Sequence, residues 1–287
     1  MRMSNLIAVL GLGAMGAAIS TSLIEGGAPV VVWNRKAEKA QCVRELGARV
    51  ADSATAACAQ ADVIVVVTAT PIDLAADFEE LGERLKGKTV VNLATGRPSE
   101  VQTLDQIVSG AGAKFISGTI QCFPPEIGGE NAVILFGGEE KIWNEVEPLL
   151  RKIAPQSTYV STRPDVPNVL DAGLTGTFVF GAGAAFLEGL RFVVNSGISI
   201  DEIRDLIPTY IAGQTRFIEG LFESVSASDY QPRGADLDIY ARATGQFQQA
   251  QEDIGHPPRI LKAIREQILS SIAEGDGDRG YAALFNQ

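Results

Sequence analysis

The feature that most constrains the fold of this 287-residue chain is an apolar run that ends in three spaced glycines. Residues 6–16 read Leu-Ile-Ala-Val-Leu-Gly-Leu-Gly-Ala-Met-Gly, and a helical pattern follows over 14–25. A strand that passes through a glycine turn into a helix lets the backbone approach a pyrophosphate at the helix N-terminus. A lone G-x-G-x-x-G motif is weak evidence, but this context predicts a dinucleotide site. The residues of the predicted loop are Gly11, Leu12, Gly13, Ala14, Met15 and Gly16.

A basic cluster follows the second apolar run, Val30–Trp33. An acidic residue at this position would hydrogen-bond a ribose 2′-hydroxyl, whereas the guanidinium fork of Arg35 suits a 2′-phosphate. Lys36 and Lys39 extend the cluster in a chain whose net charge is −11, which favours an anion site over a solvated surface charge. The pattern therefore predicts NADPH rather than NADH. The acidic balance of the whole chain argues against nucleic acid as a partner.

Strand and helix patterns alternate from residue 5 to about 160, which predicts a doubly wound parallel sheet of the α/β class. The runs 63–67 and 132–136 are continuously apolar, as in strands that are buried on both faces. The expected strands are Leu6–Leu10, Val30–Trp33, Val63–Val67, Thr89–Leu93, Lys114–Ser117 and Ala132–Phe136. The expected helices are 14–25, 36–45, 55–60, 73–86, 99–110 and 139–153, the last preceded by a turn at Gly137-Gly138.

Only helical patterns fill the chain beyond about residue 162, which predicts a Rossmann domain over 1–162 and an all-α domain over 163–287. The expected helices are 168–196, 200–225, 236–253 and 257–274, with Pro208 kinking or breaking the second. The first carries no charge over the 16 residues Ala172–Leu187. That length falls short of the roughly 20 residues that cross a bilayer, so we expect a buried helix and no membrane partner.

Glycines and apolar residues in the helical part indicate a second copy of the chain. Glycine in a helix interior costs about 1 kcal/mol relative to alanine, so Gly173, Gly176, Gly181 and Gly183 predict close helix packing. The segment 200–225 is also too apolar for the surface of a small helical domain. We therefore expect a homodimer.

The usage of cysteine and histidine argues against a metal site or a disulfide framework. Cys42, Cys58 and Cys122 are odd in number and form no C-x-x-C pair. This usage fits a reducing cytoplasm. The lone histidine, His256, is expected in a loop and has no second histidine with which to bind zinc. The apolar N-terminal run contains the glycine motif, so it is not interpreted as a signal peptide.

Several motifs together resemble those of imine reductases, also called reductive aminases, within the β-hydroxyacid dehydrogenase superfamily. They are Gly-Leu-Gly-Ala-Met-Gly (11–16), Trp-Asn-Arg-Lys-Ala-Glu-Lys (33–39), Asn-Leu-Ala-Thr-Gly-Arg-Pro (92–98), Phe-Pro-Pro-Glu-Ile-Gly (123–128), Ala-Val-Ile-Leu-Phe-Gly-Gly (132–138) and Leu-Asp (170–171). The resemblance runs nearly end to end, and its double-proline segment resembles imine reductases rather than the superfamily at large. It implies NADPH-dependent reduction of a C=N bond, from an imine or from an amine and a carbonyl compound, to give an amine.

The resemblance also implies an architecture and a set of site residues. A long helix would join the Rossmann domain to a 6-phosphogluconate dehydrogenase-like helical domain that interlocks with a second subunit, with the active site between the two subunits. Asn34, Arg35 and Lys39 match the 2′-phosphate pocket of the family. Val67 and Thr68 match cofactor contacts, and Thr95 matches the position beside the nicotinamide.

Asp171 stands where the hydroxyacid dehydrogenases of the superfamily carry a lysine near the start of the long helix, and this chain has no lysine from 153 to 261. Reduction of a ketone leaves an alkoxide, so an acid must deliver a proton. A protonated imine brings its own proton and a positive charge, which a carboxylate stabilises. The alternative role for Asp171 is a first-turn acid that stabilises the helix dipole by about 0.3–1 kcal/mol.

The sequence leaves the proton donor open. Some members of the family carry a tyrosine about two turns beyond the position of Asp171, but Thr177-Phe178-Val179-Phe180 contains none. The predicted catalytic set is Asp171, Thr95 and Tyr240, and the other candidate donors are Tyr210, Tyr230, Asp236 and Asp238. Two alternatives to an imine reductase remain: a β-hydroxyacid dehydrogenase-like carbonyl reductase, and a protein that binds NADPH without turnover.

Overall fold

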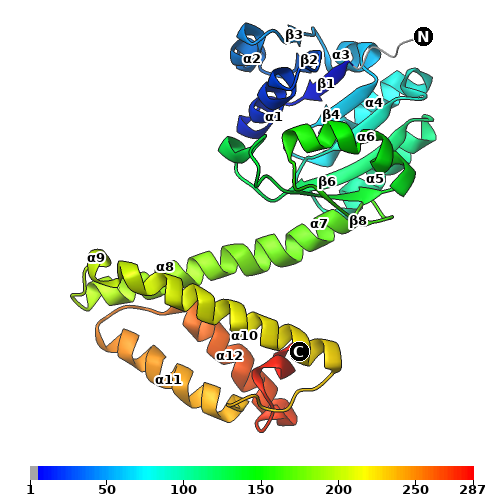
Figure 1. The fold of residues 1–287 in the computed structure, drawn as a ribbon. Helices are drawn as coiled ribbons and strands as arrows, with labels where there is room; N and C mark the ends of the chain where they lie inside the picture. Colours follow the sequence, from blue (N-terminus) through cyan, green and yellow to red (C-terminus); the bar gives the residue numbers. More distant parts are fainter. Residues whose placement is uncertain (1–5) are drawn as a thin grey trace. The chain divides into compact units, whose positions relative to one another are not determined.

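The computed structural model describes residues 6–287. The chain divides into two compact units, Met1–Phe178 and Val179–Gln287. The first unit contains a sheet with helices on both faces, and the second is helical (Figure 1). The two units are described in turn.

The first unit is built on an eight-stranded sheet with the strand order β3-β2-β1-β4-β5-β6-β7-β8. The strands are β1 Ile7–Leu10, β2 Val30–Trp33, β3 Arg49–Val50, β4 Val63–Val66, β5 Thr89–Asn92, β6 Lys114–Ile120, β7 Ile134–Gly138 and β8 Thr158–Ser161. Every neighbouring pair is parallel except β6 and β7, which are antiparallel. The predicted doubly wound parallel sheet is confirmed, and this antiparallel pair is the one departure from it. The connection between the two strands holds only the short 3-10 turn η4 (Pro124–Glu126) and no α-helix of the kind that usually forms a parallel crossover.

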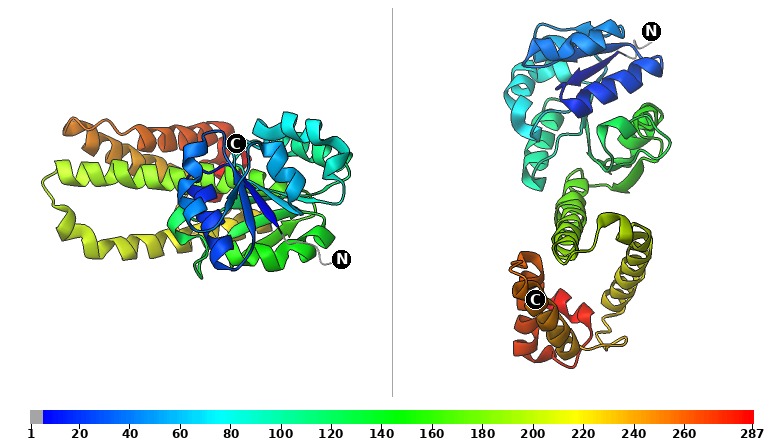
Figure 2. Two further views of the ribbon diagram at one scale, coloured as in Figure 1. Left: turned by 90° about the horizontal axis from the view of Figure 1, so that it is seen from above. Right: turned by 90° about the vertical axis from the view of Figure 1, so that its left-hand side faces the viewer.

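Helices cover both faces of this sheet (Figure 2). Along β1, Ile7 and Val9 enter one hydrophobic core while Ala8 and Leu10 enter the other, as the alternation of side chains along a strand requires. The helices of the unit are α1 Ala14–Glu25, α2 Gln41–Glu45, α3 Ala54–Gln60, α4 Ala75–Leu81, α5 Pro98–Gly110, α6 Glu140–Ile153 and α7 Val166–Leu170. Helices α1 and α6 pack in the first core, and α3, α4 and α5 pack in the second.

Two strands and one turn differ from the prediction. The edge strands β3 and β8 are short and partly exposed, so they lack the buried apolar run by which the others are found. Gly137 and Gly138 are strand residues rather than a turn. A Cβ on Gly137 would lie 2.8 Å from Cδ of Pro167, so this glycine lets the start of α7 pack directly on β7.

The long helix begins at Val166 and ends at Asn195, close to the predicted range. Its three parts are α7, the π-helical segment η5 Asp171–Val179, and α8 Phe180–Asn195. The division between the units falls within this helix at Phe178, later than the predicted boundary near 162. The difference arises because α7 packs on α5 and on β6, β7 and β8.

The second unit has a small core made by Leu237, Ala241, Ile268 and Ala283. Its remaining elements are α9 Ile200–Ile203, η6 Arg204–Leu206, α10 Ile207–Ala227, α11 Leu237–Asp253, α12 Arg259–Ser271, the π-helical η7 Ile272–Asp276 and η8 Tyr281–Asn286. Helices α11 and α12 pack on each other. The predicted helix 200–225 is broken, and Pro208 lies in the first turn of α10, where its missing N–H leaves no helical bond unmade.

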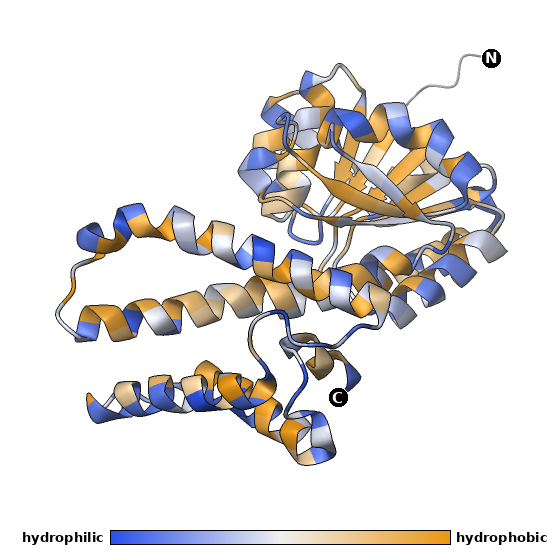
Figure 3. Ribbon diagram, turned by 60° about the horizontal axis from the view of Figure 1, so that its bottom comes forward, coloured by the Kyte–Doolittle hydropathy of each residue, from blue (hydrophilic) through white to orange (hydrophobic). Residues whose placement is uncertain are grey.

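The long helix is exposed in the single chain, so the prediction of a buried helix is wrong for this chain alone. No residue of η5 or α8 is buried. Apolar positions recur along α8 and α10 (Figure 3), and Phe180, Leu187 and Phe222 are 66%, 64% and 73% exposed. By length and composition alone the 30-residue helix could also cross a membrane. The argument that it is too short for that is therefore wrong.

Candidate functional site

The glycine loop after β1 is held by contacts that leave no room for a side chain. Gly11 has a φ of +101°, and a Cβ there would lie 2.5 Å from the carbonyl oxygen of Val67. A Cβ on Gly16 would overlap the carbonyl oxygen of Gly11. The structure therefore brings together β1, the start of α1 and the end of β4, and it places the predicted residues Val67 and Thr68 directly against the loop.

Gly13 and the first turn of α1 fit a bound pyrophosphate. Gly13 is exposed, and a Cβ there would meet nothing within 4 Å, so the chain's own packing does not require a glycine at this position. The first helical hydrogen bond runs from the N–H of Ala17 to Gly13. The N–H groups of Ala14 and Met15 therefore have no acceptor within the helix and are available to an anion. Open space beside free donors is what close approach of a phosphate needs.

Asn34 joins this loop to the end of β2. Its Oδ1 accepts a hydrogen bond of 2.8 Å from the N–H of Leu12, and its Nδ2 donates to the carbonyl of Lys36 at 2.9 Å. Arg35 and Lys39 are exposed, and within residues 6–287 neither forms an ion pair. Asn34 therefore ties the glycine loop to the end of β2, while the charges of Arg35 and Lys39 remain available to a phosphate.

Thr95 follows a turn that buried polar groups hold in place. The amide of Asn92, at the end of β5, donates to Oγ of Ser117 at 2.9 Å, and its Oδ1 accepts from the N–H of Ala94 at 3.3 Å. Asn92 and Ser117 are fully buried, whereas Thr95 is exposed. The turn thus presents Thr95 at the carboxyl end of β5, next to β4 and the glycine loop, where ligands bind in open α/β sheets.

Asp171 is joined to two of these strand ends. Asn168, three residues before it, donates from Nδ2 to the carbonyl of Gly96 at 3.0 Å, which connects the helix to the loop that carries Thr95. Gln121, one residue beyond β6, donates from Nε2 to Oδ1 of Asp171 at 3.2 Å. The structure therefore places the predicted carboxylate and Thr95 on adjoining segments of the first unit.

An ion pair fixes the start of the same helix. Asp165 is buried and accepts hydrogen bonds from Arg163 at 2.6 Å and from Gln102 at 2.9 Å. The Arg163 guanidinium holds the pKa of Asp165 below its usual range, and Gln102 adds to the effect against the cost of burial. The helix that carries Asp171 is thus anchored through side chains as well as by packing.

Sequence reasoning missed Gln121 and Asn168, although both left a signal. Gln121 is a polar residue directly before the Cys-Phe-Pro-Pro segment, and Asn168 follows Pro167 at the expected start of the helix. Neither position identifies a partner, because the bonds join residues 50 and 72 positions apart.

The third predicted catalytic residue, Tyr240, lies in the second unit. It is half-buried near the start of α11 and packs edge-to-face on Tyr281, with ring centroids 4.9 Å apart. Of the other candidates, Asp236 is the N-cap of α11 and accepts from the N–H of Ile239 at 2.8 Å. Tyr210 is 73% exposed on α10. These contacts are structural, and the catalytic assignment of Tyr240 stays a prediction.

The other residues singled out from the sequence are Tyr230, Asp238 and His256. Tyr230 is half-buried beside the core of the second unit, and Asp238 is exposed on α11. His256 lies in a loop as predicted, yet it is 4% exposed, and its ring nitrogens have no hydrogen-bond partner in the described part of the chain. Among residues 6–287 no group of acidic, histidine or cysteine side chains is arranged to hold a metal ion.

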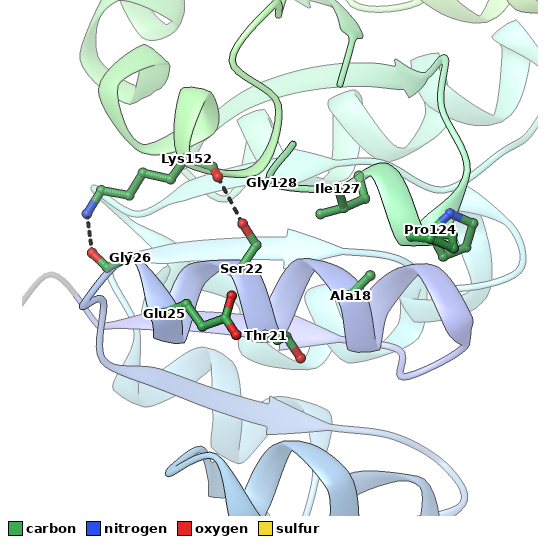
Figure 4. A pocket seen from close by; sticks show the side chains of 10 residues that line it. Ala18, Thr21, Ser22, Glu25, Gly26, Pro124, Ile127, Gly128 and Lys152 are labelled. Carbon is green, nitrogen blue, oxygen red and sulfur yellow. Dashed lines mark hydrogen bonds between the residues drawn. The ribbon is translucent and has the colours of Figure 1, made fainter. Parts of the chain in front are cut away.

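The double-proline turn lines a separate pocket. A hollow of about 540 Å³ lies between α1 and the 124–128 segment (Figure 4). Ser22 donates to the carbonyl of Lys152 at 2.9 Å, and the ammonium of Lys152 donates to the carbonyl of Gly26 at 3.0 Å. None of the predicted cofactor or catalytic residues lines this hollow. Pro124 and Pro125 therefore wall a pocket that is not the predicted site.

The strand order, the glycine loop and the polar strand ends define a dinucleotide-binding protein of the Rossmann type. Residues 6–161, more than half of the chain, match the family described as the NAD binding domain of 6-phosphogluconate dehydrogenase. The chain belongs to this family.

Relatives over the full length include an NADPH-dependent reductive aminase of Aspergillus oryzae, which is 26% identical over 99% of this chain and 97% of its own. A solved imine reductase from Pseudomonas sp. is 26% identical, covers 99% of both chains and superposes with a TM-score of 0.92. A glyoxylate/succinic semialdehyde reductase of Arabidopsis thaliana is 26% identical over 79% of this chain and 78% of its own.

Proposed function

We propose that this chain is an NADPH-dependent imine reductase that transfers a hydride to a C=N carbon and yields an amine. Full-length similarity to a reductive aminase and to an imine reductase supports the proposal. The observation that carries it is Asp171, a carboxylate bonded to Gln121 and joined through Asn168 to the loop of Thr95. An acid at this position suits a cationic substrate, since no lysine lies between residues 153 and 261.

In the first unit, some residues would bind the cofactor and others would interact with the charged substrate. The open backbone at Gly13 and the free N–H groups of α1 would hold the pyrophosphate, and Arg35 and Lys39 would hold the 2′-phosphate. When bound, NADPH supplies the hydride. Asp171 favours the protonated iminium form of the substrate, which is the form that accepts the hydride and becomes the neutral amine. Thr95 orients the substrate beside the nicotinamide.

A second copy of the chain is the proposed cover for the exposed helices. Apolar residues on α8 and α10 are exposed, and a Cβ on Gly173, Gly181 or Gly183 would meet nothing within 4 Å. These glycines therefore have no packing role within one chain, which supports close approach of a partner helix. In such a dimer Tyr240 of one subunit would donate the proton that converts a neutral imine into the iminium ion at the site of the other.

Light scattering on the purified protein tests the dimer. We expect twice the chain mass in detergent-free buffer. A monodisperse monomer would contradict the dimer, and recovery only with detergent would instead favour a membrane-bound helix.

The activity is tested by following NADPH oxidation with a panel of cyclic imines, such as pyrrolines and dihydroisoquinolines. We expect turnover by the wild type and a loss of about 100-fold or more in Asp171→Asn, because the substituted amide carries no charge. Thermal unfolding and NADPH affinity of the variant serve as controls. No turnover of any imine, and no oxidation of the matching amines, would contradict the proposal.

A carbonyl reductase is the second candidate, because one relative acts on glyoxylate and succinic semialdehyde by its name. Activity on such aldehydes that survives Asp171→Ala would favour it. Tight NADPH binding without hydride transfer to any imine or carbonyl compound would favour a non-catalytic binding protein.

A further inference from the structure

The side-chain amide of Gln121, to which the proposed function gives no role of its own, is held at both ends. Its Nε2 donates to Oδ1 of Asp171 at 3.2 Å and to Oγ1 of Thr119 at 3.3 Å. Its Oε1 accepts a hydrogen bond of 2.9 Å from the hydroxyl of Thr175. Because donor and acceptor ends are both occupied, the amide has one orientation and cannot flip without loss of these bonds.

The neighbours of this amide are themselves fixed. The N–H of Gln121 donates to the carbonyl of Val133 at 2.9 Å, which pins its backbone between the β6 and β7 segments. The hydroxyl of Thr119 donates to the carbonyl of Pro167 at 3.4 Å, so its oxygen lone pairs are left for Gln121. A rigid strand end therefore presents the amide to the helix.

The π-helical segment supplies the other half of the network. Asp171 and Thr175 belong to η5, and both bond the same amide. π-Helical segments inside α-helices are rare, and they are frequently found at functional sites. Asp171 and Thr175 are four residues apart and lie on one face of the helix, so the side chain of Gln121, just beyond β6, bonds both.

The carboxylate of Asp171 is only partly used in this arrangement. Within residues 6–287 its one side-chain hydrogen bond is that to Gln121, through Oδ1. The second oxygen is therefore left for a ligand, while the first fixes the rotamer of the carboxylate. A carboxylate held in one orientation can pair with a cationic substrate without first rearranging.

We propose that Gln121 is a positioning residue, which with Thr175 as its orienting partner holds the Asp171 carboxylate for the cationic substrate. The kinetic test of this inference rests on the proposed function, because it needs turnover of an imine. The hydrogen bond between Gln121 and Asp171 can be tested without turnover. Gln121 acts through its hydrogen bond to Asp171, and the proposal gives it no contact with the hydride donor or the reacting carbon.

The kinetic test compares Gln121→Met, which keeps the volume and removes all three side-chain hydrogen bonds, with wild type. We expect kcat for an imine to fall about tenfold, with KM for NADPH and the unfolding temperature close to wild type. Thr175→Val should lower kcat in the same direction and Thr175→Ser should restore it, because serine keeps the hydroxyl. Gln60→Met, on an exposed face of α3, is the matched control and should leave kcat unchanged.

A double-mutant cycle separates positioning from a general loss of stability. In an Asp171→Asn background, Gln121→Met should cause little further loss, because the group that it positions has been replaced. An equal tenfold loss in both backgrounds would overturn the proposal, as would a Thr175→Ser variant no better than Thr175→Val.

A spectroscopic readout keeps the inference separate from the activity. The side-chain NH₂ signals of Gln121 in ¹⁵N-labelled protein, assigned by their loss in Gln121→Met, should shift and exchange faster in Asp171→Asn. Signals that do not change would overturn the positioning role. If wild type reduces no imine while these signals do shift, the proposed function fails and the link between Gln121 and Asp171 stands.

Discussion

The glycine loop and the Asp171 network hold their shapes by different means. Gly11 and Gly16 pack against backbone carbonyls, so the loop is fixed by the absence of side chains. Asp171 is fixed by the side-chain amide of Gln121, from the end of β6, and its helix is fixed by the amide of Asn168, which donates to the loop after β5. No side chain fits at Gly11 or Gly16, whereas the hydrogen bonds around Asp171 can be removed one at a time by mutation. The cofactor site should therefore fail abruptly on mutation and the catalytic site gradually.

The largest expected effect comes from adding a methyl group inside the loop. Gly16→Ala would force a Cβ onto the carbonyl of Gly11, so we expect a loss of more than about 3 kcal/mol in unfolding free energy or an insoluble product. Gly13→Ala is the matched variant, because its Cβ would meet nothing within 4 Å. It should unfold at the wild-type temperature but bind NADPH about tenfold more weakly. Equal stability losses in the two variants would remove the steric basis of the comparison.

The next largest effect is expected at Arg35, which supplies a positive charge that the glycine loop lacks. Arg35→Ala should raise KM for NADPH by about 10- to 100-fold and leave KM for NADH nearly unchanged, since a charge-assisted bond to phosphate is worth about 1.5–3 kcal/mol. The ratio of the two constants, measured at low and high salt, tests this. Glu38→Ala, an exposed neighbour of the same turn, is a control. Equal losses with both cofactors would argue that Arg35 is structural.

The glycine loop depends on residues that are adjacent in the chain, whereas the hydrogen bonds of Asp171 join distant residues. This difference also explains what the sequence could predict. Buried apolar runs identified β1, β4 and β5 and the glycine spacing identified the loop, because both depend on residues adjacent in the chain. The antiparallel pairing of β7 and the short edge strand β3 depend on the connection and on the neighbours instead. Asp171 was found only through the family resemblance. Its partner Gln121 lies 50 residues away, and no local pattern joins the two.

A smaller effect is expected at the start of the Asp171 helix. Asp165→Asn removes the charge that Arg163 pairs with, and we expect a loss of about 1–2 kcal/mol near neutral pH. Because the pKa of Asp165 is lowered in the fold, its charged form adds stability above the unfolded pKa of about 3.9, and that stability is lost as pH falls through the lower folded pKa. The gap between variant and wild type should therefore be constant above about pH 5 and shrink below about pH 4. Urea unfolding at three pH values measures it, and a gap that widens in acid would contradict the assignment.

The smallest effect is expected at Thr95, which belongs neither to the glycine loop nor to the hydrogen bonds around Asp171. Its side chain makes no hydrogen bond within residues 6–287, so its hydroxyl contributes nothing to holding the fold. Thr95→Val should therefore leave the unfolding temperature unchanged and lower kcat only about two- to tenfold, the range of one neutral hydrogen bond. Thr95→Ser should retain wild-type kcat. If Thr95→Val instead destabilised the protein, the exposed turn after β5 would be a fixed part of the scaffold like the glycine loop. A loss of kcat alone would place Thr95 with Asp171, among groups that are positioned by the fold and used by the substrate.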